Sequence, residues 1–160
     1  MSSSCETELI KLQEIADLPY HWSAGKYGSK FLRSLRDEKK FWGTRCPQCE
    51  KVYFPPREVC GPCFAHIEEW VELPTEGTLT AFSVVNFPFI DPELGDKRPV
   101  PYTFGYIQLD GCDTAMSHFV NEHDHTKLWR GMRVEAVFKE DGQREGNMQD
   151  VLYFEIKENQ

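Results

Sequence analysis

The sequence has no long apolar run and no recognisable secretion signal. Nowhere in its 160 residues do about eighteen apolar side chains follow one another, the length that a membrane-spanning helix needs. The opening stretch, MSSSCETELIKLQEIADLPYHW, lacks the basic and apolar regions of a signal peptide. We therefore expect a cytoplasmic protein that does not enter the membrane, in which cysteine thiols stay reduced.

The chain also lacks the common sequence signatures of catalysis. It contains no glycine-rich phosphate loop, no His-Glu-x-x-His helix and no Ser-His-Asp order. Cys5 and Cys112 are isolated, and a nucleophilic cysteine needs a neighbouring base. His118, His123 and His125 are better explained as one strand residue and two solvated loop residues than as ligands of a second metal. We expect no intrinsic catalytic activity.

Four of the six cysteines stand in one segment, RCPQCEKVYFPPREVCGPC. Their pattern is Cys46-x2-Cys49-x10-Cys60-x2-Cys63, two tight turns that each aim two sulfurs at one point. Paired motifs at this spacing favour one tetrahedral metal ion over disulfides or a redox CxxC, and zinc over iron. Because protein sulfurs fill all four positions, we expect one structural zinc per chain and no catalytic metal. Loss of Cys60 is expected to unfold this module and spare the rest.

Two helices are predicted before the cysteines. Residues 6–17 have apolar side chains at roughly helical spacing, and residues 29–40 form a stronger helix that Ser29 begins as N-cap. The apolar stripe of the second helix needs a partner surface, and the sequence suggests that it is exposed for docking. Its members are Phe31, Leu32 and Leu35, with Trp42 as an extension.

After the cysteines the apolar period changes from helical to two, which is typical of strands. Five strands are predicted, in the segments TLTAFSVVNF, 102–110, 114–120, 133–139 and 151–157. Gly111 lies in a tight hairpin, and Asp124 caps a short helical turn that Gly131 ends. In the first strand one face is predicted to carry Leu79, Ala81, Ser83, Val85 and Phe87, and the other Phe82 and Val84.

This order of strands, with a helical turn after the third, is typical of an OB-fold, although another small antiparallel barrel or sandwich has a similar pattern. We predict a mainly β protein, with a helical segment at 1–40, a zinc ribbon at 41–70 and a five-stranded OB-fold barrel at 71–160. The proline-rich loop between the first two strands, PFIDPELGDKRPVP, has the length of a binding element.

Several motifs together resemble the DUF35 family. They are FWGTRC, the double CxxC with FPPR between its pairs, EGTLTAFSVV, PYTFGYIQLDG and LWRGMRVEAVF, in the family's order over about residues 26–157. The resemblance implies a rubredoxin-like zinc ribbon joined to an OB-fold. It also implies a non-catalytic subunit that docks on a thiolase-fold catalytic subunit in a hetero-oligomer and helps to form the acyl-CoA channel.

A coenzyme A thioester carries phosphates that lysine and arginine can neutralise. Three cations follow one another at helical spacing (i, i+4, i+7), at and just before the start of the second predicted helix, and three others lie in or beside the ribbon. These candidate CoA-binding residues are Lys26, Lys30, Arg33, Arg45, Lys51 and Arg57.

Two other functions stay open. The chain is also compatible with an accessory domain of an acyl-CoA hydratase complex. Zinc ribbons and OB-folds further serve as single-stranded nucleic-acid binders, which stack bases on aromatic side chains such as Tyr102 and Tyr106. A formal net charge of −8, and acidic residues such as Asp110 and Glu135 on the predicted strands, make nucleic acid the weaker hypothesis.

Overall fold

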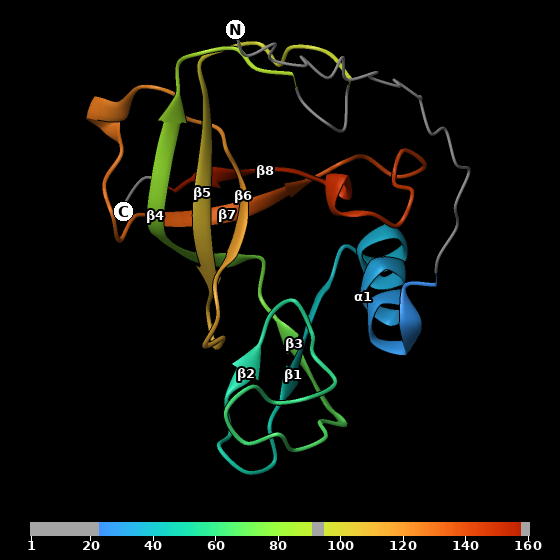
Figure 1. The fold of residues 1–160 in the computed structure, drawn as a ribbon. Helices are drawn as coiled ribbons and strands as arrows, with labels where there is room; N and C mark the ends of the chain where they lie inside the picture. The colour runs from blue at the N-terminus through green and yellow to red at the C-terminus, as the bar shows by residue number, and fades with distance from the viewer. Residues whose placement is uncertain (1–22, 91–94, 158–160) are drawn as a thin grey trace, which may run out of the picture.

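The computed structural model describes residues 23–90 and 95–157, which fold into a small sheet, a barrel and one α-helix (Figure 1). The helix predicted at 6–17 lies outside the described residues. None of the helices that are described is long and apolar enough to cross a membrane. The five predicted barrel strands are all present, each within a few residues of its expected bounds.

The cysteine segment belongs to a three-stranded antiparallel sheet of order β2-β1-β3. Its strands are β1 (Phe41–Arg45), β2 (Val52–Tyr53) and β3 (Glu69–Leu73). In β2 the side chains alternate: Val52 packs into the main core, and Tyr53 packs into a second, smaller cluster around the cysteines. The sheet therefore contributes to two cores at once.

The barrel strands pair in a ring of order β4-β5-β6-β8-β7, and β7 pairs back with β4. They are β4 (Glu76–Val85), β5 (Tyr102–Leu109), β6 (Met116–Val120), β7 (Arg133–Phe138) and β8 (Val151–Ile156). Two 3-10 turns, η1 (His125–Lys127) and η2 (Met148–Asp150), precede β7 and β8. The β6–β8 pairing is a single parallel pair, Val120 with Phe154, so the ring is thinnest there.

A β-bulge in β4 corrects the predicted faces of that strand. The pairing with β5 shifts between Leu79 and Ala81, and an extra residue on one strand moves every later side chain to the opposite face. Leu79 is fully buried, but beyond the bulge Phe82 and Val84 pack against the core while Ala81 is exposed. Simple alternation fails because it assumes an unbroken period of two.

Two turn predictions have a mixed outcome. Gly111 has a φ of 78° in the β5–β6 hairpin, as expected of a tight turn. The Asp124 side chain caps η1 by accepting a hydrogen bond from the backbone N–H of Thr126. Gly131 does not end this turn, because η1 stops at Lys127; Gly131 has a φ of 96° in the connection to β7.

The helix α1 (Gly25–Glu38) begins four residues before the predicted start. Ala24 is its N-cap residue, without a side-chain hydrogen bond, and Ser29 lies inside the helix. Its apolar stripe is not a free docking surface, because Phe31 and Leu35 are buried in the same chain and Phe31 meets Phe54 edge-on. Trp42 does not extend the helix and lies in β1.

One hydrophobic core joins the ribbon to the barrel. The ribbon contributes Phe41, Val52, Phe54 and Leu73, which pack in one cluster with the barrel interior. The β5–β6 hairpin is also hydrogen-bonded to β2 and the residue after it. The Asp113 carboxylate accepts from the backbone N–H of Val52, and the Thr114 hydroxyl accepts from the N–H of Phe54 and donates to its carbonyl, each at 2.8 Å. This shared core argues against the expectation that the ribbon can unfold and spare the barrel.

Candidate metal centre and neighbouring surfaces

The four cysteines of the double CxxC motif meet at one end of the ribbon. The sulfurs of Cys46, Cys49, Cys60 and Cys63 all lie within 4.8 Å of one another, and those of Cys49 and Cys60 are 3.7 Å apart. A tetrahedral zinc with Zn–S bonds near 2.3 Å needs sulfurs about 3.8 Å apart. The donor set and its spacing thus fit a zinc ion, which would hold the ribbon in shape and leave no coordination position for substrate.

The two halves of the site have the same backbone design. The backbone N–H groups of Glu50 and Phe64 bond the carbonyls of Cys46 and Cys60, four residues earlier. Glu50 and Phe64 also share left-handed φ angles of 60° and 54°. A second hydrogen bond closes each turn: the N–H of Cys46 donates to the carbonyl of Lys51, and the N–H of Cys60 donates to the carbonyl of Ala65. The repeat in the sequence is therefore a repeat in structure.

A tyrosine supports the buried side of the cluster. The Tyr53 hydroxyl lies 3.2 Å from the sulfur of Cys60, which is fully buried. This hydrogen bond stabilises the thiolate and lowers the pKa of Cys60 to about 6, despite burial. Since metal binds the thiolate, the contact favours metal at neutral pH.

The structure does not gather the six candidate CoA-binding cations into one site. Lys30 and Arg33 line a hollow of about 280 Å³ on α1, together with the acidic side chains Asp37 and Glu38. The Lys30 ammonium lies 4.1 Å from the ring centre of Trp70 and 4.7 Å from that of Trp42. This contact with two rings fixes Lys30 beside the ribbon.

The other four cations lie outside the lining of that hollow. Arg45 pairs with Glu69 at 3.0 Å on the ribbon sheet, and Arg57 stacks over Tyr53 at 5.3 Å. Lys26 lies 5.9 Å from the ring centre of Tyr27, and Lys51 is exposed beside the first cysteine pair.

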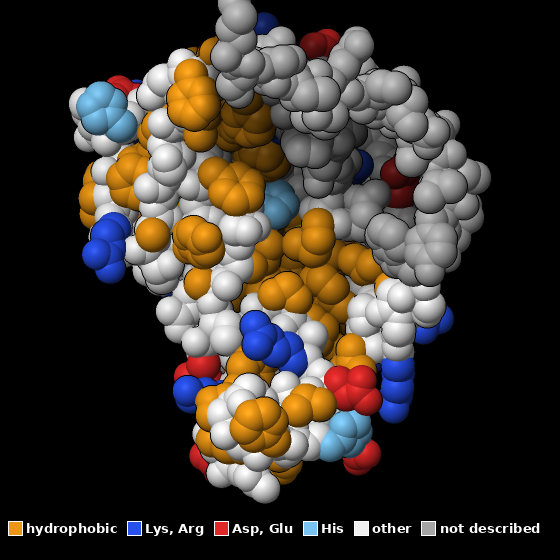
Figure 2. Space-filling model, viewed as in Figure 1, with side chains coloured by type: hydrophobic (Ala, Val, Ile, Leu, Met, Phe, Trp, Pro, Cys, Tyr) orange, Lys and Arg blue, Asp and Glu red, His pale blue; other side chains and the backbone are white. Residues whose placement is uncertain are grey.

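An aromatic surface on the barrel was not predicted as a site. Rings contact one another in series from Phe87 through Phe89, Tyr102 and Phe119 to Phe104, with ring centres 5.2–6.4 Å apart. Hydrophobic side chains gather on this face, over β4 to β6 (Figure 2). The alternation of Tyr102, Phe104 and Tyr106 along β5 was visible in the sequence, but not which face would remain uncovered. We call these rings, with Tyr106, the aromatic face.

The histidines separate into two kinds. His123 and His125 are exposed, whereas His118 is buried with 7% of its surface exposed. Among residues 23–90 and 95–157, the four cysteines are the one group of metal-ligating side chains close enough to share an ion. Cys112 is buried, and its thiol is 3.1 Å from the carbonyl oxygen of Thr114.

Comparison with known proteins agrees with this architecture. Residues 33–69 match the family model of the ChsH2 rubredoxin-like zinc ribbon domain, and residues 70–139 match that of the ChsH2 C-terminal OB-fold domain. A solved structure named "Ltp2-ChsH2(DUF35) aldolase" superposes with a TM-score of 0.60 at 18% identity, over 85% of this chain and 98% of that chain. A DUF35 protein of unknown function from Sulfolobus solfataricus superposes with a TM-score of 0.57 at 18% identity, over 84% of this chain and 87% of that chain.

Two curated relatives are called DUF35 domain-containing scaffold proteins. The one from Methanocaldococcus jannaschii is 33% identical over 114 residues, which cover 69% of this chain and 77% of the relative. The one from Methanothermobacter thermautotrophicus is 28% identical over 109 residues, covering 67% and 77%. The chain has a zinc ribbon with its four cysteines, followed by an OB-fold barrel, and it belongs to the DUF35 family.

Proposed function

We propose that this chain is a non-catalytic scaffold subunit that docks on a thiolase-fold enzyme and helps to form its acyl-CoA channel. The names of its relatives support a scaffold role, and one similar structure bears the name "Ltp2-ChsH2(DUF35) aldolase", which joins a DUF35 protein to an enzyme. The finer form of the proposal is the small subunit of a thiolase that acts on a 3-oxoacyl-CoA such as benzoylsuccinyl-CoA, in anaerobic toluene degradation.

The observation that carries the docking role is the aromatic face. Tyr106 is 54% exposed and Phe87 67% exposed, beside the partly buried rings of Tyr102 and Phe119. Contiguous exposed rings of this kind mark interaction sites, because a monomer gains nothing from leaving them in water. This face replaces the apolar stripe of α1, which the chain itself covers, as the docking surface.

The zinc ribbon has a supporting role in this proposal. One zinc, held by Cys46, Cys49, Cys60 and Cys63, keeps the ribbon and α1 folded against the barrel. Of the candidate cations, Lys30 and Arg33 are the pair best placed to meet a CoA phosphate, because they share one hollow. Asp37 and Glu38 in the same hollow oppose an anion, so we expect CoA contact only when a partner subunit contributes to the site.

Co-purification tests the proposal. The full-length chain and a thiolase-fold subunit encoded beside it are expected to co-elute in size-exclusion chromatography, with acyl-CoA thiolysis by the complex and none by this chain alone. Tyr106→Ser and Phe87→Ser should each weaken the complex, whereas Val59→Ser, at an exposed apolar residue of the ribbon, should not. Thiolysis by the purified chain alone would refute the accessory role.

The same samples separate the alternatives. A stable complex with a hydratase in place of a thiolase would favour the hydratase reading. Salt-sensitive binding of a single-stranded oligonucleotide at sub-micromolar concentration would favour a nucleic-acid module, for which the aromatic face offers stacking rings. We do not expect oligonucleotide binding, since the net charge of −8 repels a polyanion.

A further inference from the structure

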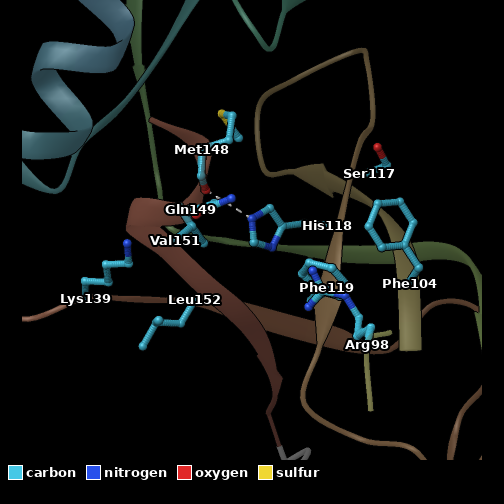
Figure 3. Close-up of a pocket in the computed structure, with 10 residues that line it drawn as sticks. All are labelled: Arg98, Phe104, Ser117, His118, Phe119, Lys139, Met148, Gln149, Val151 and Leu152. Atoms are coloured by element: carbon cyan, nitrogen blue, oxygen red, sulfur yellow. Dashed lines mark hydrogen bonds between the residues drawn. The ribbon is translucent and has the colours of Figure 1, made fainter. Parts of the chain in front are cut away.

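The barrel has a cavity of about 350 Å³ at the seam where β6 and β8 share one pair (Figure 3). Phe104 and Phe119 form one wall, and Val151 and Leu152 of β8 lie opposite. Cavities of this size hold small ligands. The site lies on the second and third strands of the OB-fold, the face that such barrels use for binding.

His118 stands at the back of this cavity. One ring nitrogen, Nε2, lies 3.3 Å from the carbonyl oxygen of Met148, so Nε2 carries the proton and donates it. The other nitrogen, Nδ1, is buried and has no hydrogen-bond partner among the described residues. A buried polar atom without a partner is rare in a folded protein and calls for a ligand or water. Desolvation lowers the pKa of His118, which keeps the ring neutral in the empty cavity.

The charged side chains that line the cavity in the described part of the chain are the cations Arg98 and Lys139. Arg98 stacks over the ring of Phe119, with 4.4 Å between the guanidinium carbon and the ring centre, and Lys139 lines the opposite side. Within residues 23–90 and 95–157 no carboxylate lines the cavity, in a molecule whose net charge is −8. Within the described residues the Lys139 ammonium has no acidic partner. The described lining therefore combines the Lys139 ammonium with aromatic walls.

We propose that this cavity binds a small aryl carboxylate. The ring of the ligand lies against Phe104 and Phe119, and its carboxylate pairs with Lys139. His118 then takes up a proton from solvent at Nδ1 and turns from an unpartnered acceptor into a donor toward the anion. In the described part of the chain, no acidic side chain of residues 95–101, η2, β7 or β8 lines the cavity to compete for that proton. The proposal needs neither zinc chemistry nor a docked partner, although Phe104 and Phe119 also belong to the aromatic face.

Nuclear magnetic resonance of the imidazole groups tests it on the full-length, zinc-loaded chain. Benzoate is expected to shift the His118 signals in a saturable way and to raise the pKa of His118, whereas benzamide, its neutral counterpart, is expected to do neither. Lys139→Gln should weaken benzoate binding by about tenfold, the value of one charge-assisted contact. Lys127→Gln, at a lysine of η1 that is 66% exposed and outside the cavity lining, is the matched control and should leave it unchanged.

A second probe identifies the source of the carboxylate. A response of His118 to benzoate assigns the cavity to free aryl acids, and a response only to 4-carboxybenzoyl-CoA assigns it to a carboxylated acyl group carried on coenzyme A. Either result supports the site. No response of His118 to either probe, or equal responses to benzoate and benzamide, overturns it, whatever the outcome of the thiolase experiment.

Discussion

Asp150 holds the loop before β8 with a carboxylate that solvent does not reach. Its side chain is fully buried and accepts hydrogen bonds from the backbone N–H groups of Glu145, Gly146 and Asn147, at 2.7–3.2 Å. Nearby, Arg144 bonds the carbonyl of Arg36, which attaches the same loop to the end of α1. One acidic side chain thus organises the contact between the loop and the helix.

We expect Asp150→Ala to lower the free energy of unfolding by about 3 kcal/mol, because three partly buried N–H donors lose a buried acceptor. Urea denaturation of the zinc-loaded chain measures this loss. Asp141→Ala is the control, since Asp141 is 84% exposed in its ion pairs with Lys39 and Arg144. Its loss should stay below about 1 kcal/mol. Equal losses in the two variants would show that Asp150 contributes only surface charge.

At Glu50 the backbone conformation determines how a substitution changes the stability of the chain. Its φ of 60° is left-handed, a conformation that costs a side chain about 1–2 kcal/mol and glycine almost nothing. We expect Glu50→Gly to stabilise the chain by about 0.5–1 kcal/mol after the larger entropy of the unfolded glycine chain is subtracted. Thermal unfolding at a fixed zinc concentration measures it. Lys51→Gly, one residue on and without a positive φ, should destabilise the chain instead.

At the scale of elements, ion pairs link β4, β5, β7 and β8 at one end of the barrel. Arg133 bonds both carboxylate oxygens of Asp110, and Lys157 reaches Glu76 at 2.7 Å and Glu135 at 3.1 Å. The hydrogen bond from Arg133 is the largest of the effects that lower the pKa of Asp110 below its ordinary value of 3.8. This carboxylate therefore stabilises the fold most when it is ionised.

We expect Arg133→Met to be less stable than the wild type by about 0.5–1 kcal/mol at pH 7, a small value because both side chains are partly exposed. A carboxylate whose pKa is depressed on folding stabilises the fold above its unfolded pKa, and this contribution is lost as pH falls through the folded value. The difference between the two proteins should therefore shrink below about pH 3.8. The zinc ligands are the same in the wild type and in Arg133→Met, so the difference between their denaturation curves at each pH isolates the Arg133–Asp110 pair. A constant difference down to pH 2 would assign the effect to packing.

The whole molecule behaves as one unit because ribbon, helix and barrel share their core. The Tyr27 hydroxyl of α1 donates a hydrogen bond to the carbonyl of Ile67, and the ring of Tyr27 stacks on Trp70. The ring centre of Phe41 in the ribbon lies 5.0 Å from that of Phe54 and 6.4 Å from that of Phe154 in the barrel. A disturbance at the cysteines therefore reaches the barrel through buried rings.

Removal of zinc by a chelator is expected to destabilise the barrel as well as the ribbon. The apparent binding free energy of structural zinc, roughly 10–16 kcal/mol, is as large as the whole stability of a typical domain. Amide hydrogen exchange should show lost protection at Leu109 in β5 together with loss at Thr44 in β1. Retained protection in β5 alone would show that the barrel is independent of the ribbon.

The sequence by itself determined the local features of this protein. The spacing of Cys46, Cys49, Cys60 and Cys63 fixed the metal cluster, because ligand spacing in a tight turn is a property of a few neighbouring residues. The apolar period located the barrel strands for the same reason. Only the tertiary structure decided what depends on distant partners: the face of β4 after its bulge, the cover over α1, and the burial of His118 beside a cationic cavity. Each of these is set by side chains far apart in the chain, and no local pattern of residues records which of them will meet.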